Sequence, residues 1–337
     1  SSVKQYFPLG LATVTVRIYD SFRSNFEDHA SSTYNINFYV WQSEEMPLTA
    51  TDINYIWGKG ADLYVTANNG GSPAVRIFRY VDGDNPSLTY DETKDNFTLT
   101  ATCSFELASA SVLYGSKIMS LGVDGANAVI CTDIATGAPK YTLALSSANF
   151  SSLDTHPSDE TLCYLTAGTG ASTALIKYNP LLGTAAAYIT EAEGKSFDEL
   201  QRVRYVYNSP NYGGKVFAVD TGNDRVVRYL FDSVSDPRII TATSPVDVAF
   251  AKDYAFTLSD SDSKISVHAI TNTGNVLLME FGGANTGSSY EMGKFKNPTG
   301  LYCYTGKDLF ILDKDRKCIH LIRSGMSDWL SGIRLAD

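Results

Sequence analysis

The amino-acid sequence predicts an all-β protein, a single β-propeller of six four-stranded blades, and three observations lead to this fold class. Tyr and Phe are abundant, with 21 and 16 copies in 337 residues, and together with many Val, Ile and Thr they favour strands over helices. Short apolar segments alternate with turns rich in Gly, Asp and Asn. In the C-terminal half these segments recur about every 45 to 53 residues, which is typical of propeller blades.

The recurring unit is an apolar strand, an Asp, a tight polar turn and a second apolar strand. Its copies cover residues 214–228, 254–268 and 307–322. Asp220, Asp260 and Asp313 stand at the end of the first strand of these copies. Because the feature repeats with the blade, we expect the Asp to cap the turn by accepting amide hydrogen bonds rather than to bind a cation.

A further strand precedes each copy, and its opening carries a family resemblance. Pro298-Thr299-Gly300-Leu301 opens one such strand, and the turn of another copy reads Asp220-Thr221-Gly222-Asn223-Asp224-Arg225. With these features, residues 200–322 resemble NHL repeats, less closely over 244–281. The resemblance implies a propeller and makes the repeating Asp part of its architecture.

The first half of the chain shows the same rhythm of strands without the motif. We expect three blades there, with strands at 52–57, 62–66, 74–80 and 97–105; at 111–115, 118–122, 128–132 and 141–145; and at 150–156, 161–167, 174–178 and 186–190. With the three downstream units these blades make six.

The division of the chain follows from how such a ring closes. The last unit has three strands, and open sheet edges invite other chains. We therefore expect Asn35–Val40 to complete the last blade, within a propeller of residues 33–325 followed by a tail of 326–337. Residues 1–32 form an extension with one strand, in which Val14, Val16 and Ile18 share a face. That strand either packs on its own propeller or pairs with a neighbouring subunit by strand addition.

Charge and composition exclude several partners. The net charge of −10 argues against nucleic acid, which is bound through clustered Lys and Arg. The sequence has no run of 18 apolar residues, so we expect no membrane-spanning helix. The start Ser1-Ser2-Val3-Lys4 reads as a processed terminus, and Asn96 and Asn149 lie in glycosylation sequons. We expect a protein secreted to the extracellular space or cell surface.

The five cysteines form no C-x-x-C pair, so zinc-ribbon and thioredoxin interpretations fail. Cys303 and Cys318 lie on strands of one predicted blade and are candidates for a disulfide. The alternative is that all five cysteines are small buried hydrophobic residues.

No catalytic constellation stands out, and we expect neither a metal nor a cofactor. The sequence lacks a Gly-x-Ser-x-Gly elbow. His268 and His320 fall in third strands, away from a propeller's central channel, and are expected to be ordinary partly buried histidines.

Loop residues are the remaining candidates for binding, because rigid sheets hold loop tips in place. The candidates are Asn68, Asn69, Asn208, Asn211, Tyr212 and Tyr290. We expect a non-enzymatic interaction or assembly module, whose partner is a protein or a second copy. The alternatives are a glycan-binding propeller and a lactonase- or lyase-like enzyme with a metal in its channel.

Overall fold

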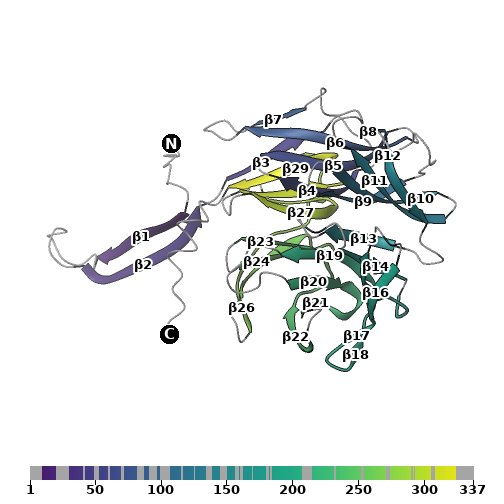
Figure 1. Ribbon diagram of the computed structural model, residues 1–337. Coiled ribbons are helices and arrows are strands. Elements are labelled where there is room, and N and C mark those ends of the chain that lie inside the picture. Colours follow the sequence, from purple (N-terminus) through teal and green to yellow (C-terminus); the bar gives the residue numbers. More distant parts are fainter. Residues whose placement is uncertain are drawn as a thin grey trace.

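The chain is seen in a computed structural model (Figure 1). The structure describes residues 10–19, 30–40, 42–48, 53–59, 61–69, 72–81, 87–90, 97–98, 107–114, 117–124, 126–133, 139–144, 150–155, 159, 162–168, 170–179, 182, 184–206, 215–230, 233–251, 254–270, 274–289, 291, 293–304 and 308–323.

The described residues form β-strands and one 3₁₀ turn, η1, at Thr221–Asn223. The part of the chain that is described contains no helix long and apolar enough to cross a membrane. The prediction of an all-β protein is confirmed.

Five sheets have four antiparallel strands. They are β9 to β12 (Leu107–Tyr114, Lys117–Asp124, Ala126–Asp133, Pro139–Ala144); β13 to β16 (Phe150–Thr155, Cys163–Ala167, Ala174–Asn179, Thr184–Ile189); β19 to β22 (Leu200–Val206, Lys215–Asp220, Arg225–Leu230, Ser233–Thr241); β23 to β26 (Pro245–Ala251, Tyr254–Ser259, Lys264–Ile270, Asn275–Gly282); and β27 to β29 with β3 (Pro298–Tyr304, Asp308–Asp313, Cys318–Arg323, Gln42–Pro47).

Another sheet has five strands, and two smaller sheets have two strands each. The five-stranded sheet contains β4 to β8 (Ile53–Lys59, Asp62–Asn69, Ser72–Val81, Ser87–Tyr90, Phe97–Thr98), in which β7 and β8 both pair with β6. The two-stranded sheets are β1 with β2 (Gly10–Tyr19, Ala30–Val40) and β17 with β18 (Glu191–Ala192, Lys195–Ser196).

The first strands of the larger sheets stand next to one another around a ring. Strand β4 contacts β9, β9 contacts β13, β13 contacts β19, β19 contacts β23, β23 contacts β27, and β27 returns to β4. A closed ring of antiparallel sheets is a β-propeller. Six four-stranded blades were predicted, but the structure has five. The sheet that begins with β4 has five strands instead of four. Its outer part is β7 together with β8, where a single strand over 97–105 was expected.

The strand that closes the ring is not the predicted one. We expected Asn35–Val40 to complete the last blade, but Ala30–Val40 pairs with β1 in a hairpin, and Gln42–Pro47 pairs with β29. A hairpin partner close in sequence costs little loop-closure entropy. Strand β3 was not predicted, because Glu44 and Glu45 give its sequence the polar character of a loop.

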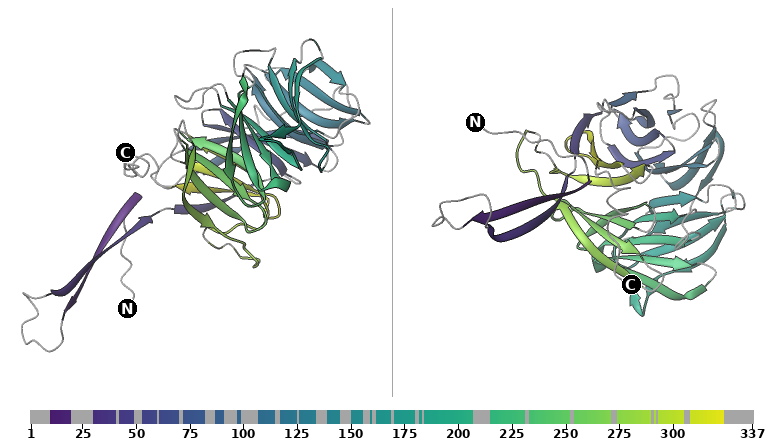
Figure 2. Two further views of the ribbon diagram at one scale, coloured as in Figure 1. Left: turned by 90° about the horizontal axis from the view of Figure 1, so that it is seen from below. Right: turned by 90° about the vertical axis from the view of Figure 1, so that its left-hand side faces the viewer.

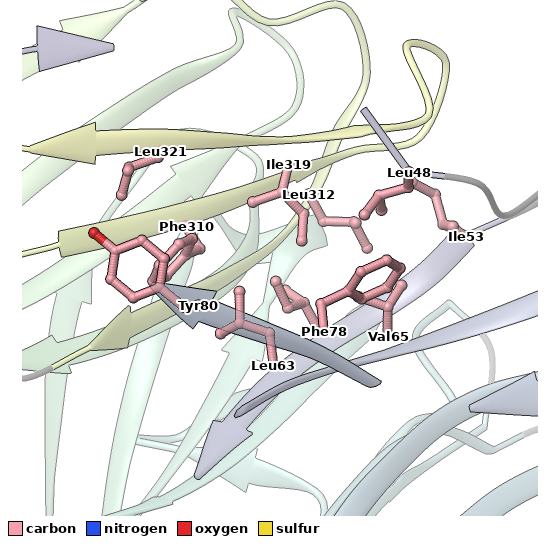
Figure 3. Packing of buried hydrophobic residues seen from close by; sticks show 11 residues of the cluster. Leu48, Ile53, Leu63, Val65, Phe78, Tyr80, Phe310, Leu312, Ile319 and Leu321 are labelled. Carbon is pink, nitrogen blue, oxygen red and sulfur yellow. The ribbon is translucent and has the colours of Figure 1, made fainter. Parts of the chain in front are cut away.

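A core of apolar side chains joins the last blade to the five-stranded sheet (Figure 3). Phe310 is fully buried, and its ring meets that of Tyr80 edge-on at 5.0 Å between centroids. The Tyr80 hydroxyl donates a hydrogen bond of 2.8 Å to Asp308. The closure is therefore made of side-chain packing as well as the β29–β3 ladder.

The β1–β2 hairpin, which we call the arm, extends away from the propeller in all three views (Figures 1 and 2). Its register pairs Gly10 with Val40 and Val16 with Tyr34. Of the two expectations for the first strand, the described part of the chain shows neither: β1 pairs with β2 of its own chain.

Candidate functional site

The inner strands of the propeller share an irregularity that positions the side chains at its centre. One residue near the start of the strand is skipped in the pairing with the second strand. These bulges fall between Ile53 and Tyr55, Phe150 and Ser152, Leu200 and Arg202, Pro245 and Asp247, and Pro298 and Gly300. A bulge re-aims the side chains next to it.

Residues that follow three of these bulges meet in one group. Tyr55, Arg202 and Asp247, together with Arg204 two positions further along β19, form what we call the axial cluster. They come from β4, β19 and β23, so strands distant in sequence are brought together.

Arg204 is the centre of the axial cluster. Its Nε and Nη2 donate to the two carboxylate oxygens of Asp247 at 3.0 and 2.5 Å, a bidentate pair. Its Nη1 donates to the Tyr55 hydroxyl at 2.6 Å. Nη2 also reaches the carbonyls of Leu301 at 3.1 Å and Ile56 at 3.4 Å. One side chain on β19 is thereby bonded to β4, β23 and β27.

Arg202 lies beside this pair and shares the ring of Tyr55. The guanidinium carbons of Arg202 and Arg204 lie 4.3 and 4.7 Å from the ring centroid, within cation–π range. Nη2 of Arg202 donates to the Thr299 carbonyl at 3.0 Å, and its Nε lies 3.9 Å from Asp247. Because β19 stands between β13 and β23 in the ring, its bonds to β4 and β27 cross the propeller's centre.

The axial cluster is almost closed to solvent. The side chains of Arg202 and Arg204 are 10% and 12% exposed, and that of Asp247 is fully buried. The carboxylate of Asp247 also accepts the backbone amides of Val248 and Leu301, both at 2.8 Å. A buried ion pair of this kind is compensated only by such additional hydrogen bonds.

Burial and charge act on the ionisation of the cluster in opposite directions. Burial raises the pKa of Tyr55 to about 12, although Arg204 opposes it. Burial lowers the pKa of Arg202 below its usual value in spite of the attraction of Asp247. For Arg204, burial also acts to lower the pKa, but Asp247 outweighs it and the pKa is raised. Burial and the charge of Asp247 therefore shift the pKa values of the two arginines in opposite directions.

Gly300 leaves the space that the axial cluster fills. A Cβ atom at this position would lie 2.9 Å from Cγ2 of Ile56 and 3.6 Å from Asp247. Ser152, after the bulge in β13, instead accepts the amide of Val203 at 3.2 Å and so ties β13 to β19. The hydrogen bonds of the axial cluster and of Ser152 brace the inner strands against one another.

The turn-capping interpretation is confirmed at Asp313, which accepts the amide of Arg316 in the turn at 3.2 Å, whereas Asp220 makes no side-chain cap bond to the turn η1. Asp220 accepts the amide of Asp198 at 2.7 Å, and Asp313 accepts the amides of Lys296 and Asn297 at 2.7 and 3.1 Å. Each carboxylate thus ties the end of the second strand to the segment that precedes the first.

The assignment of Asp260 to this position is wrong by one residue. The pairing of first and second strands matches Leu200 with Asp220 and Pro298 with Asp313, but Pro245 with Ser259. Asp260 follows strand β24 and is exposed.

Asp220 has a second role, in the small β17–β18 hairpin. It pairs with Arg225 at 2.6 Å between buried side chains. Arg225 in turn donates to the carbonyls of Ala192 and Lys195 at 3.2 and 3.0 Å. The Asn223 amide and the Tyr229 hydroxyl donate to the carbonyls of Ser196 and Glu191, so three side chains of the blade hold the hairpin.

Both candidate histidines are buried in their blades. His320 lies 3.1 Å from Asp313, and its ring meets Phe295 edge-on. His268 lies 3.4 Å from the hydroxyl of Thr257. Among the described residues no three His, Cys, Asp or Glu side chains gather in a way that could hold a metal ion.

The predicted disulfide is wrong. Cys303 and Cys318 are not joined. Cys303 lies on β27 opposite Leu309 of β28, whereas Cys318 lies on β29 opposite Asp313. Strand β28 separates the two cysteines, which also stand at opposite ends of the blade, so the short approach that a disulfide needs is not met.

Most of the predicted loop residues lie outside the described part of the chain. Asn68 and Asn69 end strand β5, opposite Pro73 and Ser72. The others, with both glycosylation candidates, lie outside the described residues: Asn208, Asn211, Tyr212, Tyr290, Asn96 and Asn149. Their roles stay predictions.

The sequence contains a signal for the axial cluster, namely charged residues inside apolar inner strands. Arg202 and Arg204 stand at alternate positions of an inner strand whose other residues, apart from Gln201, are apolar, and Asp247 stands two positions after Pro245 in another. Charged residues at alternate positions of a buried strand need partners. Which partners they find depends on the ring, because the contributing strands are far apart in sequence.

Searches against protein-family models and against curated proteins find no match for this chain. The resemblance to NHL repeats therefore stays a prediction.

Proposed function

We propose that this chain is a non-enzymatic scaffold, a propeller that brings protein chains together, with the arm as its contact to another chain. In this proposal the five-stranded sheet counts as a sixth blade, because β4 takes the place in the ring between β27 and β9. The sequons at Asn96 and Asn149 support an extracellular setting.

One observation carries the proposal: the arm stands outside a ring that closes without it. Strand β3 supplies the missing strand of the last blade, so the β1–β2 hairpin is not needed for closure. A two-stranded hairpin by itself is marginally stable in water and requires a further surface. Because the arm points away from its own propeller (Figure 2), another chain is the natural source of that surface.

The axial cluster supports the scaffold role. Its charged groups are engaged with one another and with backbone carbonyls across the ring. Such bracing keeps the blades in fixed relation, which suits a platform that positions an attached arm.

Photo-crosslinking tests the proposal. A photoreactive phenylalanine analogue is placed in the full chain at Val16 of the arm, and in a matched chain at Leu182, which is 72% exposed on the propeller. After irradiation in an extract of the cells that make the protein, we expect adducts with a second polypeptide from the arm position and far fewer from Leu182. Absence of polypeptide adducts at Val16 would contradict the proposal.

A further inference from the structure

We infer that the arm binds the arm of a second copy of this chain, face to face about a two-fold axis. This inference rests on the proposed scaffold function and names its partner. It starts from the pairing of β1 with β2.

The register of the arm separates two chemically different faces. Directly paired residues of antiparallel strands share a face, and the faces alternate along each strand. One face, here the apolar face, therefore holds five pairs: Gly10 with Val40, Ala12 with Phe38, Val14 with Ile36, Val16 with Tyr34, and Ile18 with Ser32. The opposite face, here the polar face, holds Leu11 with Tyr39, Thr13 with Asn37, Thr15 with Asn35, and Arg17 with Thr33.

The apolar face contains no ionisable group except the phenol of Tyr34. Such a surface on a projecting ribbon is stabilised when another apolar surface covers it. In the described part of the chain, β1 and β2 pair only with each other. The remaining question is what covers the face.

The distribution of charge along the chain favours a second copy that makes contact through its arm. Residues 1–40 contain three basic and three acidic residues, so residues 41–337 carry the entire net charge of −10. Two propellers in direct contact would repel each other. Arms that meet at their apolar faces bring together a neutral segment and hold the acidic propellers apart.

Symmetry makes the same face its own partner. A two-fold contact uses one patch twice, and an uncharged patch meets its copy without like-charge opposition. A ribbon of two ten-residue strands is about 34 Å long and about 10 Å wide. Two such faces bury roughly 700 Å² together, below the range of about 1,200 to 2,000 Å² typical of stable complexes. We therefore expect a reversible dimer with micromolar affinity.

The competing acceptor on the propeller is the outer edge of strand β26. Val276 and Leu277 there are 48% and 52% exposed. An arm could add to this edge as an extra strand, which would produce an open chain of copies rather than a closed dimer. The experiment separates the two.

Sedimentation velocity of the full chain from about 1 to 200 μM measures the association. We expect wild type to pass from monomer to dimer and no further. Val16→Asp and Ile36→Asp, on the apolar face, should weaken association at least 100-fold. The matched controls Thr15→Asp and Asn37→Asp place the same charge on the polar face one residue away and should retain the dimer.

Three results would overturn the inference. The wild-type chain could remain monomeric at 200 μM, or the two polar-face variants could dissociate as readily as the apolar-face ones. Loss of association in Leu277→Asp would place the contact on β26 instead. A wild-type monomer in which the probe at Val16 still crosslinks to a different protein would leave the scaffold proposal standing while removing the second copy as its partner.

Discussion

At the scale of single residues, His268 shows how burial lowers the pKa of a side chain. Its side chain is 2% exposed in β25, and Nδ1 has no hydrogen-bond partner among the described residues. Burial lowers its pKa from 6.5 to about 4, against the opposing influence of Glu280. The folded protein therefore keeps this imidazole neutral in mildly acidic solution.

This pKa predicts a loss of stability in acid. Between pH 6.5 and about 4 the unfolded chain binds a proton at His268 that the folded chain does not, so the free energy of unfolding falls as the pH falls through this window. From pH 7 to pH 5 the loss due to this residue is about 2 kcal/mol. Urea denaturation of wild type and His268→Gln at both pH values measures it. An identical pH dependence of the two proteins would contradict the assignment.

At the scale of elements, the bulged inner strands determine where charge can be buried. Tyr55, Arg202 and Asp247 each follow a bulge, and the bonds of Arg202 and Arg204 cross the ring to other strands. The cluster works as a unit because one carboxylate serves two guanidinium groups.

Removal of that carboxylate charge should therefore be costly. Asp247→Asn leaves both arginines buried without a charged partner among the side chains of the axial cluster, and we expect it to lower the free energy of unfolding by about 3–5 kcal/mol. Chemical denaturation measures the change. The matched control is Asp262→Asn, which removes an exposed ion pair with Lys264 and should cost less than about 1 kcal/mol. Equal effects of the two substitutions would mean that the axial cluster does not brace the ring.

The outer strands differ in how they discourage pairing with other chains. Strand β22 contains Pro237, β12 begins with Pro139, and β3 carries Glu44 and Glu45. Proline and charge both protect an open edge. Strand β26 has no such residue before Glu280, and its Val276 and Leu277 are exposed, so its edge is the competing acceptor to test for the arm.

At the scale of the whole molecule, the ring is held by the contact between its last blade and the five-stranded sheet. Phe310 and Leu312 of β28 pack with Leu63 and Phe78 of the five-stranded sheet (Figure 3). A ring that opens here exposes sheet faces on both sides, so this core should govern global stability.

Phe310→Ala tests that expectation. Loss of a fully buried ring should lower the free energy of unfolding by about 3–5 kcal/mol, in one cooperative transition. Thermal and denaturant unfolding followed by circular dichroism measure it. Leu182→Ala, at an exposed position, should stay within about 0.5 kcal/mol of wild type. A separate early transition in Phe310→Ala would show that the blades unfold independently.

The sequence by itself determined the fold class and much of the strand order. The spacing of apolar segments and turns is a local property, and it placed the repeated units at 214–228, 254–268 and 307–322 within blades. Asp313 was assigned correctly as a turn cap for the same reason, because the amide of Arg316 that it accepts lies 3 residues away. Asp260 shows the limit, since a shift of one residue changes the position in a strand.

Only the tertiary structure decided which strand closes the ring, what the first strand pairs with and which charges meet at the axis. Strands Ala30–Val40 and Gln42–Pro47 adjoin in sequence, yet the first joins the arm and the second the last blade. Arg204 and Tyr55 are 149 residues apart, and no local pattern encodes their hydrogen bond. Such contacts depend on ring closure, which brings strands together by the geometry of all the sheets at once.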